Sequence, residues 1–551
     1  MIIQDEFCKY YKEYLDGTYD CVDRIVLNAY FPLAQSNGGF RTWWRMLMQS
    51  DDTLDNTHLM RFAGRFSRRI HAYAQKKGIP LIHCQRDERK HEIAGQYIPT
   101  EPTFRGIFCI LVGRAPAPVF EVKRFANGGM DITKKTPQPY VNQYSFHIMD
   151  HEWGHLVIKL CPHPPFNAQV ILNGHEYVAI RAKKENIPFT KEGNCFTQVG
   201  NATGLARIAD TMRAPCSVGR LVQVCERWMY SACLCFALDS TEQEKSEFRY
   251  SYSVYQLEYS RNLLFMRGHT LDQVFHGVID RTRALLNIKT VKTIFGYKHR
   301  PFKKNTMGKG TRCEAVVERP DYDLTVFKIH CGKLTVKIYS KGERVLRIEA
   351  IAHNTKELRC GKVIGKFPVI AELLRGILER FLCVLRCVDI SFLDVNAFET
   401  WPVPSTVGVT RVGGINVNHS RIRAVMEAII ALSANPQGFT AADLAEKVRE
   451  ILKNSDGKYQ SRQASYDLKK FRGKELIRRD EHSRCYQATK NGLQMITAYI
   501  VLREKTLIPL LTSAGKRKTG PKPPNHSQID IHYKNIQIEM QNIFKIIGIA
   551  A

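Results

Sequence analysis

Residues 333–353, KLTVKIYSKGERVLRIEAIAH, decide the fold predicted for the centre of this 551-residue chain. Apolar and polar side chains alternate along the stretch on both sides of Gly342, a pattern typical of two strands joined by a turn. Two shorter alternating runs precede it, CEAVVERP at 313–320 and LTVFKIHC at 324–331, separated by Pro-Asp and Cys-Gly-Lys turns. Together these runs predict a β-meander between about 311 and 352.

Elements on either side of the meander complete the predicted fold. The segment 367–388, FPVIAELLRGILERFLCVLRCV, has one broad apolar face and predicts a helix that covers the sheet. Residues 1–300 mix strand-like runs, such as FRGIFCILVGR at 104–114, with helical ones at 58–78 and 251–267. The fold class expected is α+β, with a large mixed body, a β-meander with covering helices, and a C-terminal winged-helix domain.

The boundaries expected from composition divide the chain into five segments. They are an α+β body at 1–300, a basic loop with meander and helix at 301–400, a Pro/Gly-rich linker at 401–417, a winged helix at 418–511, and a basic linker with a terminal helix at 512–551. In the last segment Ile536, Met540, Ile543 and Ile547 recur at helical spacing, which suits either packing against the body or a homodimer contact.

The charge balance points to a polyanionic partner. Lys and Arg number 81 against 53 Asp and Glu, for a formal net charge of +28. Such an excess favours nucleic acid, DNA before RNA, over an anionic membrane surface. No apolar run is long enough to span a bilayer, and the N-terminus lacks a secretion-signal layout. The 16 cysteines include no C-x-x-C pair, which favours a reducing, cytoplasmic location.

From residue 419 the pattern becomes helix, helix, helix, hairpin, helix. Thr440 and Asp443 mark the start of the second helix, and the final CYQATKNGLQMI at 485–496 combines a strand with a helix start. This order resembles the MarR-type winged-helix DNA-binding domains of bacteria, over about 90 residues. The resemblance implies that one helix reads bases in the major groove and that the hairpin, or wing, grips phosphates.

Basic residues concentrate where such a domain would touch DNA. Between Lys458 and Lys490 there are ten Lys or Arg and four Asp or Glu. The candidate nucleic-acid-binding residues here are Arg462, Lys469, Lys470, Arg472, Lys474, Arg478, Arg479 and Arg484. A second basic stretch with interleaved aromatics, at 295–312, adds Lys298, Arg300, Lys303 and Lys304. For both stretches the alternative is a charged surface that contacts only water.

The hairpin at 337–350 also carries a second resemblance. Its Tyr339, Lys341, Arg347 and Glu349 are loosely similar to strands of rolling-circle replication initiators. That similarity implies a carboxylate that helps to hold a divalent metal, Mg²⁺ or Mn²⁺, during DNA cleavage. The simpler interpretation is a hairpin with a cross-strand charge pair.

The body itself resembles a poorly characterised bacterial family whose members carry a winged-helix tail. The stretches that carry this resemblance include DRIVLNAYF at 23–31, YQLEYSRNLLF at 255–265 and VKIYSKGERVLRIEA at 336–350. It implies mobile-element or DNA-transaction biology and no defined activity. The acids first considered as catalytic, if the body processes DNA, are Asp150, Glu349 and Glu258, which is expected on a helix beside Gln256 and Tyr259.

The motif HEWGH at 151–155 offers a different function. In zinc metallopeptidases H-E-x-x-H places two ligands and a base on one helix, and Glu176 stands where a third ligand is sometimes found. The alternative metal site would be His151, His155 and Glu176. However, the flanking NQYSFHIM and HLVIKL indicate strands, with Trp153-Gly154 between them. We therefore interpret the motif as a β-turn and keep the zinc peptidase, and a ligand-sensing regulator, as alternatives.

Overall fold

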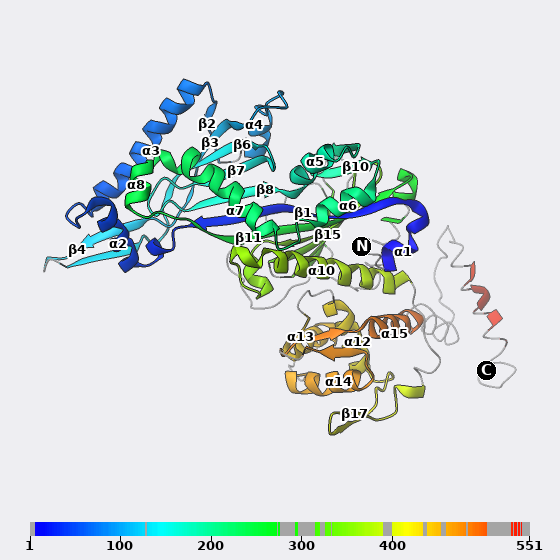
Figure 1. The fold of residues 1–551 in the computed structure, drawn as a ribbon. Coiled ribbons are helices and arrows are strands. Elements are labelled where there is room, and N and C mark those ends of the chain that lie inside the picture. Colours follow the sequence, from blue (N-terminus) through cyan, green and yellow to red (C-terminus); the bar gives the residue numbers. More distant parts are fainter. Residues whose placement is uncertain are drawn as a thin grey trace.

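The body is built on one twelve-stranded sheet in a computed structural model (Figure 1). The structure describes residues 6–86, 88–126, 129–272, 274–275, 292–295, 314–319, 326–331, 333–389, 399–433, 438–452, 459–480, 483–503, 531–532, 534–536, 538–539 and 542. In spatial order the strands are β12 (Lys292–Phe295), β13 (Glu314–Arg319), β14 (Val326–Cys331), β15 (Leu334–Lys341), β16 (Val345–Ala352), β11 (Ser251–Phe265), β1 (Leu15–Tyr30), β8 (Ala168–Asn173), β7 (Gly154–Leu160), β6 (Tyr140–Asp150), β3 (Gly106–Pro116) and β2 (Leu81–His83).

All neighbouring strands run antiparallel except the two outermost pairs, β12 with β13 and β2 with β3. The meander predicted at 311–352 is confirmed as β13 to β16. It does not stand apart from the body, because β16 pairs with β11 and the sheet continues across the boundary expected at residue 300. The mixed α+β class is also confirmed.

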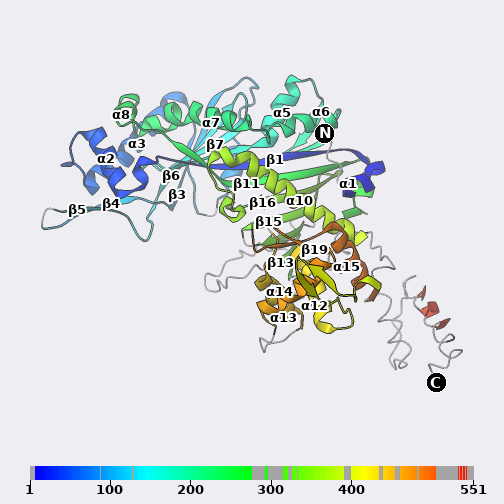
Figure 2. The same ribbon diagram turned by 60° about the horizontal axis from the view of Figure 1, so that its bottom comes forward.

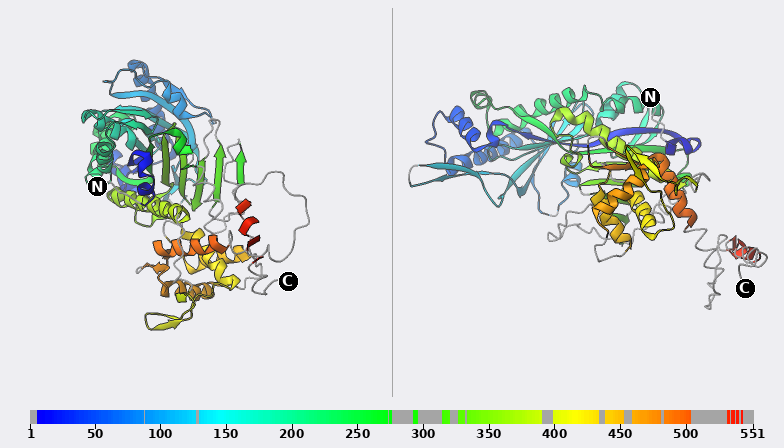
Figure 3. Two further views of the ribbon diagram at one scale, coloured as in Figure 1. Left: turned by 90° about the vertical axis from the view of Figure 1, so that its right-hand side faces the viewer. Right: turned by 90° about the horizontal axis from the view of Figure 1, so that it is seen from below.

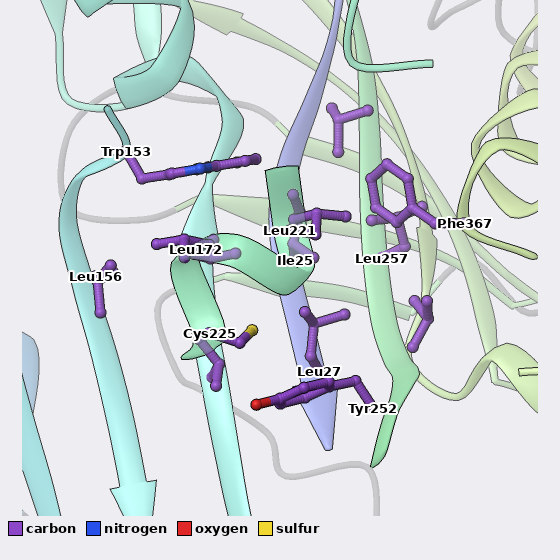
Figure 4. Close-up of a cluster of buried hydrophobic side chains, with 14 of the residues drawn as sticks. Ile25, Leu27, Trp153, Leu156, Leu172, Leu221, Cys225, Tyr252, Leu257 and Phe367 are labelled. Atoms are coloured by element: carbon purple, nitrogen blue, oxygen red, sulfur yellow. The ribbon is translucent and has the colours of Figure 1, made fainter. Parts of the chain in front are cut away.

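Several helices pack together on one face of this sheet, which we call the helix-covered face. They include α3 (Asn56–Lys77), α7 (Ser217–Trp228) and α10 (Phe367–Asp389), the last of which confirms the predicted covering helix. Figure 2 shows α10 lying along β11 and β16. In Figure 4 the side chains of Leu221 and Phe367, from α7 and α10, meet Ile25, Leu27 and Leu257 from the strands. None of the described helices has the length and apolar character needed to cross a bilayer.

The segment 251–267 was predicted to be helical, and this prediction is wrong: it forms β11, the strand between β1 and β16. Most of its side chains are buried on both sides of the sheet. A strand covered on both faces loses the alternation of apolar and polar residues that identifies half-exposed strands. The spacing of the apolar residues at 254, 257, 263 and 264 therefore resembled that of the apolar face of a helix.

The C-terminal unit contains the predicted order of elements. These are α12 (Ser420–Ser433), α13 (Ala441–Leu452), α14 (Ser461–Gly473), the hairpin β19 (Ile477–Arg479) and β20 (Tyr486–Ala488), and α15 (Lys490–Leu502). They share a core separate from that of the sheet. Figures 1 and 3 show α10 between the sheet and this unit, with α14 on the side away from α10.

The expected linker at 401–417 is part of this C-terminal unit. Trp401 and Ile415 are buried in its core, and Ile415 N donates to Trp401 O. Between them, β17 (Ser405–Val407) and β18 (Thr410–Val412) form a hairpin against α14. This hairpin could not be recognised in the sequence, because a short hairpin rich in Pro, Gly and Val has little periodicity.

Candidate functional site

A group of charged side chains crosses the other face of the sheet, and Arg347 lies at its centre. Arg347 on β16 is fully buried. Its Nε donates to Glu349 Oε1 at 2.7 Å, its Nη2 donates to Asp23 Oδ2, and its Nη1 donates to the carbonyl of Asn194. Tyr339 on β15 adds a hydroxyl that donates to Glu349 Oε1 at 2.7 Å. One guanidinium thus neutralises two carboxylates from different strands.

Asp23 reaches this network because β1 has a bulge. Val22 and Ile25 are three positions apart, whereas their partners on β11, Tyr259 and Leu257, are two positions apart, so β1 has one extra residue. His175, fully buried on α5 (Gly174–Lys184), places its Nδ1 2.5 Å from Asp23 Oδ1. Burial opposes ionisation of Asp23, but Arg347 and His175 outweigh it and lower its pKa to about 2.

Glu258 lies beside these ion pairs. On β11, Ser260 is the register partner of Glu349, and Glu258 is two residues away, so its side chain points to the same face. Burial raises the pKa of Glu258 to about 7, and Asp23 and Glu349 add to the effect, while Lys337 and Arg24 oppose it. Gln256 Nε2 donates to Glu258 Oε1 at 2.8 Å. The structure therefore brings together two predicted acids, Glu258 and Glu349, and a third that the sequence did not single out, Asp23.

The arrangement does not resemble a metal site. Within the part of the chain that the structure describes, no three His, Cys, Asp or Glu side chains are placed to hold a metal ion. Arg347 accounts for this, since it occupies the space between Asp23 and Glu349 and satisfies both carboxylates. The cross-strand charge pair that was the simpler interpretation is present, as Lys337 Nζ lies 3.8 Å from Glu349 Oε2.

We expect the Glu258→Gln variant to be more stable than the wild type at high pH. The folded protein holds a proton on Glu258 up to about pH 7, whereas the unfolded chain releases it near 4.3. Stability therefore falls as pH rises through this window and stays lower above it. Chemical denaturation should show similar stabilities near pH 4 and an advantage of about 1–3 kcal/mol for the variant at pH 8.

The exposed Glu343→Gln serves as the control, with changes within about 0.5 kcal/mol at either pH. Equal stabilities of wild type and Glu258→Gln at pH 8 would show that Glu258 is not forced to ionise in an unfavourable environment.

Asp150, the third predicted acid, lies apart from this group, in the turn between β6 and β7. Its Oδ1 accepts from the backbone N–H groups of Glu152 and Trp153, and its Oδ2 accepts from Arg227 and from Trp228 Nε1 at 2.8 Å. Burial opposes ionisation, but these donors lower the pKa of Asp150. Because the Asp150 carboxylate accepts four hydrogen bonds, it fixes the turn and links α7 to it.

The prediction that HEWGH forms a turn is confirmed. Asp150 and Gly154 are register partners in the β6–β7 hairpin, with His151 exposed in the turn and His155 in β7. His155 Nε2 lies 3.0 Å from His147 Nδ1, and Glu176 in α5 pairs with Lys191 at 2.7 Å. The zinc alternative needs His151 and His155 one helical turn apart, and the hairpin does not provide this.

The basic helix of the C-terminal unit has one exposed face. In α14, Ala464, Leu468 and Phe471 are buried, while Arg462, Lys469 and Arg472 are exposed. At about 100° per residue these three lie within an arc of roughly 80°. None of them pairs with a carboxylate of any described residue. We call Arg462, Lys469 and Arg472 the basic face of α14.

Asp467 fixes the orientation of this face. Its side chain is fully buried and accepts from Tyr459 OH at 2.9 Å and from Arg421 of α12 at 3.3 Å. The start of α14 borders a cavity of about 490 Å³, lined by Arg421, Gln460, Arg462, Gln463 and Tyr466. Arg421 was not identified from the sequence, because its role depends on a contact 46 residues away.

The other predicted basic residues are placed differently. Lys470 turns inward, with Nζ 3.8 Å from Asp467, and Lys474 is half-buried. Arg478 borders a cavity of about 290 Å³ that Glu379 of α10 also lines, so it faces the body. Arg479 and Arg484 are exposed on the hairpin. Arg411, exposed on β18, adds a basic residue that the sequence did not indicate.

The remaining predicted residues belong to segments outside the described ranges. Lys298, Arg300, Lys303 and Lys304 lie outside the described residues, as does most of the terminal segment with Met540, Ile543 and Ile547. No protein-family model, curated protein or solved structure matches this chain. The chemistry of its own residues is therefore the basis for any conclusion about its function.

Proposed function

We propose that this chain is a nucleic-acid-binding protein of the cytoplasm that contacts DNA through the basic face of α14. The observation that carries the proposal is the basic face itself. Three cationic side chains of one helix point to solvent, among described residues no carboxylate neutralises them, and the side chains opposite are fixed in the core. A rigid helix that presents unpaired cations is suited to a phosphate backbone or a groove.

Two further observations support this assignment. The order of helices and hairpin is that of a winged helix, in which α14 corresponds to the helix that enters the major groove. In addition, α14 lies on the side of the C-terminal unit away from α10, beside the β17–β18 hairpin (Figure 3). Twelve cysteines whose side chains the structure describes are free thiols, in keeping with a reducing compartment.

The proposed function is binding of nucleic acid. Glu349 is held by Arg347 and Tyr339, and Asp150 has four donors, so these acids have structural roles in the fold. Glu258 retains acid–base potential near neutral pH, but no described residue offers the metal set of a nuclease. A regulator whose body senses a ligand remains compatible with the same binding surface.

The test is equilibrium binding of the full chain to a 30-base-pair DNA duplex, an RNA duplex and single-stranded DNA over a range of salt concentrations. We expect the DNA duplex to bind most tightly, with affinity falling steeply as salt rises, because bound phosphates release condensed counterions. Binding that is absent, or insensitive to salt between 50 and 200 mM, would refute the proposal.

A further inference from the structure

A polar cleft lies over the face of the sheet opposite to α3, α7 and α10. Its volume is about 650 Å³, within the range of small-ligand sites. It is bordered by strands β1, β3, β6, β7, β8 and β11 and by residues of the segments that connect them. Its polar and charged lining residues include Asn28, Gln143, Gln169, Lys159 and Lys362.

Strand register explains why these side chains meet. Lys159 on β7 is the partner of Gln169 on β8, Gln169 is the partner of Asn28 on β1, and Asn28 is the partner of Ser253 on β11. Partners in antiparallel strands point to the same face, so four polar residues form one row across the sheet. At about 4.8 Å per strand the row extends roughly 14 Å, enough for one nucleotide unit.

The charge in this cleft is of one sign. Lys159 is half-buried, and burial lowers its pKa, with Lys90 and Arg24 adding to the effect. Among the residues that the structure describes, no carboxylate forms an ion pair with Lys159 or Lys362, and none lines the cleft. A cation held near two others, with part of its hydration removed, is a favourable place for an anion.

The neutral lining residues indicate more than a simple anion. Carboxamides offer both a donor and an acceptor, and Asn and Gln use these groups to recognise the polar edges of bases. Gln169 Nε2 already donates to Asn28 Oδ1 at 3.0 Å, which orients the pair and leaves the oxygen of Gln169 and the amide nitrogen of Asn28 available. Tyr30, also in the lining, offers a ring for stacking.

We propose that this cleft binds a nucleotide phosphate, with the phosphate held between Lys159 and Lys362, which reach in from opposite ends of the polar row, and the base edge at Asn28, Gln143 and Gln169. The ligand is either a free nucleotide or the phosphorylated end of a strand, because both present the same chemical groups. The site is separate from the basic face of α14 and does not require that surface to bind DNA.

The experiment measures binding of the full chain to four probes by calorimetry. They are a mixture of 5′-mononucleotides, a 5′-phosphorylated tetranucleotide, the same tetranucleotide without its phosphate, and inorganic phosphate. We expect the phosphorylated tetranucleotide to bind at least about 10-fold more tightly than its unphosphorylated form, as a charge-assisted hydrogen bond predicts. Mononucleotides that bind equally well would identify the ligand as free nucleotide, and weaker ones would identify a strand end.

Variants assign the binding to this cleft. Lys159→Met and the exposed Lys362→Met should each weaken binding of the phosphorylated probe about 10-fold, and Gln169→Leu should weaken nucleotides but not inorganic phosphate. Lys76→Met, an exposed lysine on α3, is the control. Lys362 is on the surface, so its variant keeps the test valid if Lys159→Met does not fold.

The proposal is overturned if Lys362→Met binds the phosphorylated probe as tightly as the Lys76→Met control does. It is also overturned if inorganic phosphate binds as tightly as nucleotides. Loss of the basic face of α14 should leave this binding unchanged, so failure here is distinguishable from failure of the DNA-binding proposal.

Discussion

The Arg347→Met variant should lose about 3–5 kcal/mol of unfolding free energy, the usual cost of removing one partner from a buried ion pair. Arg347 is fully buried and neutralises both Asp23 and Glu349. Methionine fills similar space but leaves two carboxylates without their cation in the interior. Urea denaturation of both proteins at pH 7, followed by circular dichroism, measures the loss.

Two further variants make this result specific. Arg347→Lys keeps the charge but has no planar fork to bind two carboxylates, so we expect it to be destabilised as well. Arg344→Met, at an exposed position three residues earlier, should change stability by no more than about 0.5 kcal/mol. A loss below about 1 kcal/mol for Arg347→Met would contradict the central role given to this residue.

The second large effect is expected in binding. Replacing Arg462, Lys469 and Arg472 together with glutamine should weaken DNA binding about 100-fold near 100 mM salt, because each lost phosphate contact contributes roughly 1 kcal/mol. The three side chains are exposed, so the fold should persist. Fluorescence anisotropy with a labelled duplex measures the affinity.

A matched variant separates local contact from net charge. Arg61, Lys76 and Lys77 are exposed on α3, and their replacement with glutamine removes the same number of charges. We expect this variant to bind within about 3-fold of the wild type, since screened charges far from the contact contribute little. Similar losses for the two variants would mean that the affinity comes from the general charge of the chain.

Much of the fold could be predicted where apolar and polar residues recur with a clear period. The meander around Gly342, the covering helix at 367–388 and the hairpin that contains HEWGH were all predicted from alternation or helical spacing. The strand β11 could not be predicted in this way, because both its faces are covered. The β17–β18 hairpin was missed because three-residue strands carry almost no periodic signal.

The site was predictable only in part, since its members come from distant segments. Glu349 was predicted as a site residue from the hairpin that contains it. Glu258 was also predicted as a site residue, but it was assigned to a helix and lies on a strand. Asp23 gave no signal, because a bulge in β1 and a contact with Arg347, 324 residues away, bring it into the network. In α14, spacing could not show that Lys470 turns inward toward Asp467.

The most direct test of the account is the slope of log Kobs against log salt concentration for wild type and the Arg462→Gln, Lys469→Gln, Arg472→Gln triple variant on one DNA duplex. Each phosphate that a cation neutralises contributes about −0.9 to the slope. We predict that the slope of the triple variant is shallower than that of the wild type by about 2–3, while the α3 variant keeps the wild-type slope. Equal slopes for the wild type and the triple variant would show that the basic face of α14 does not contact the DNA backbone.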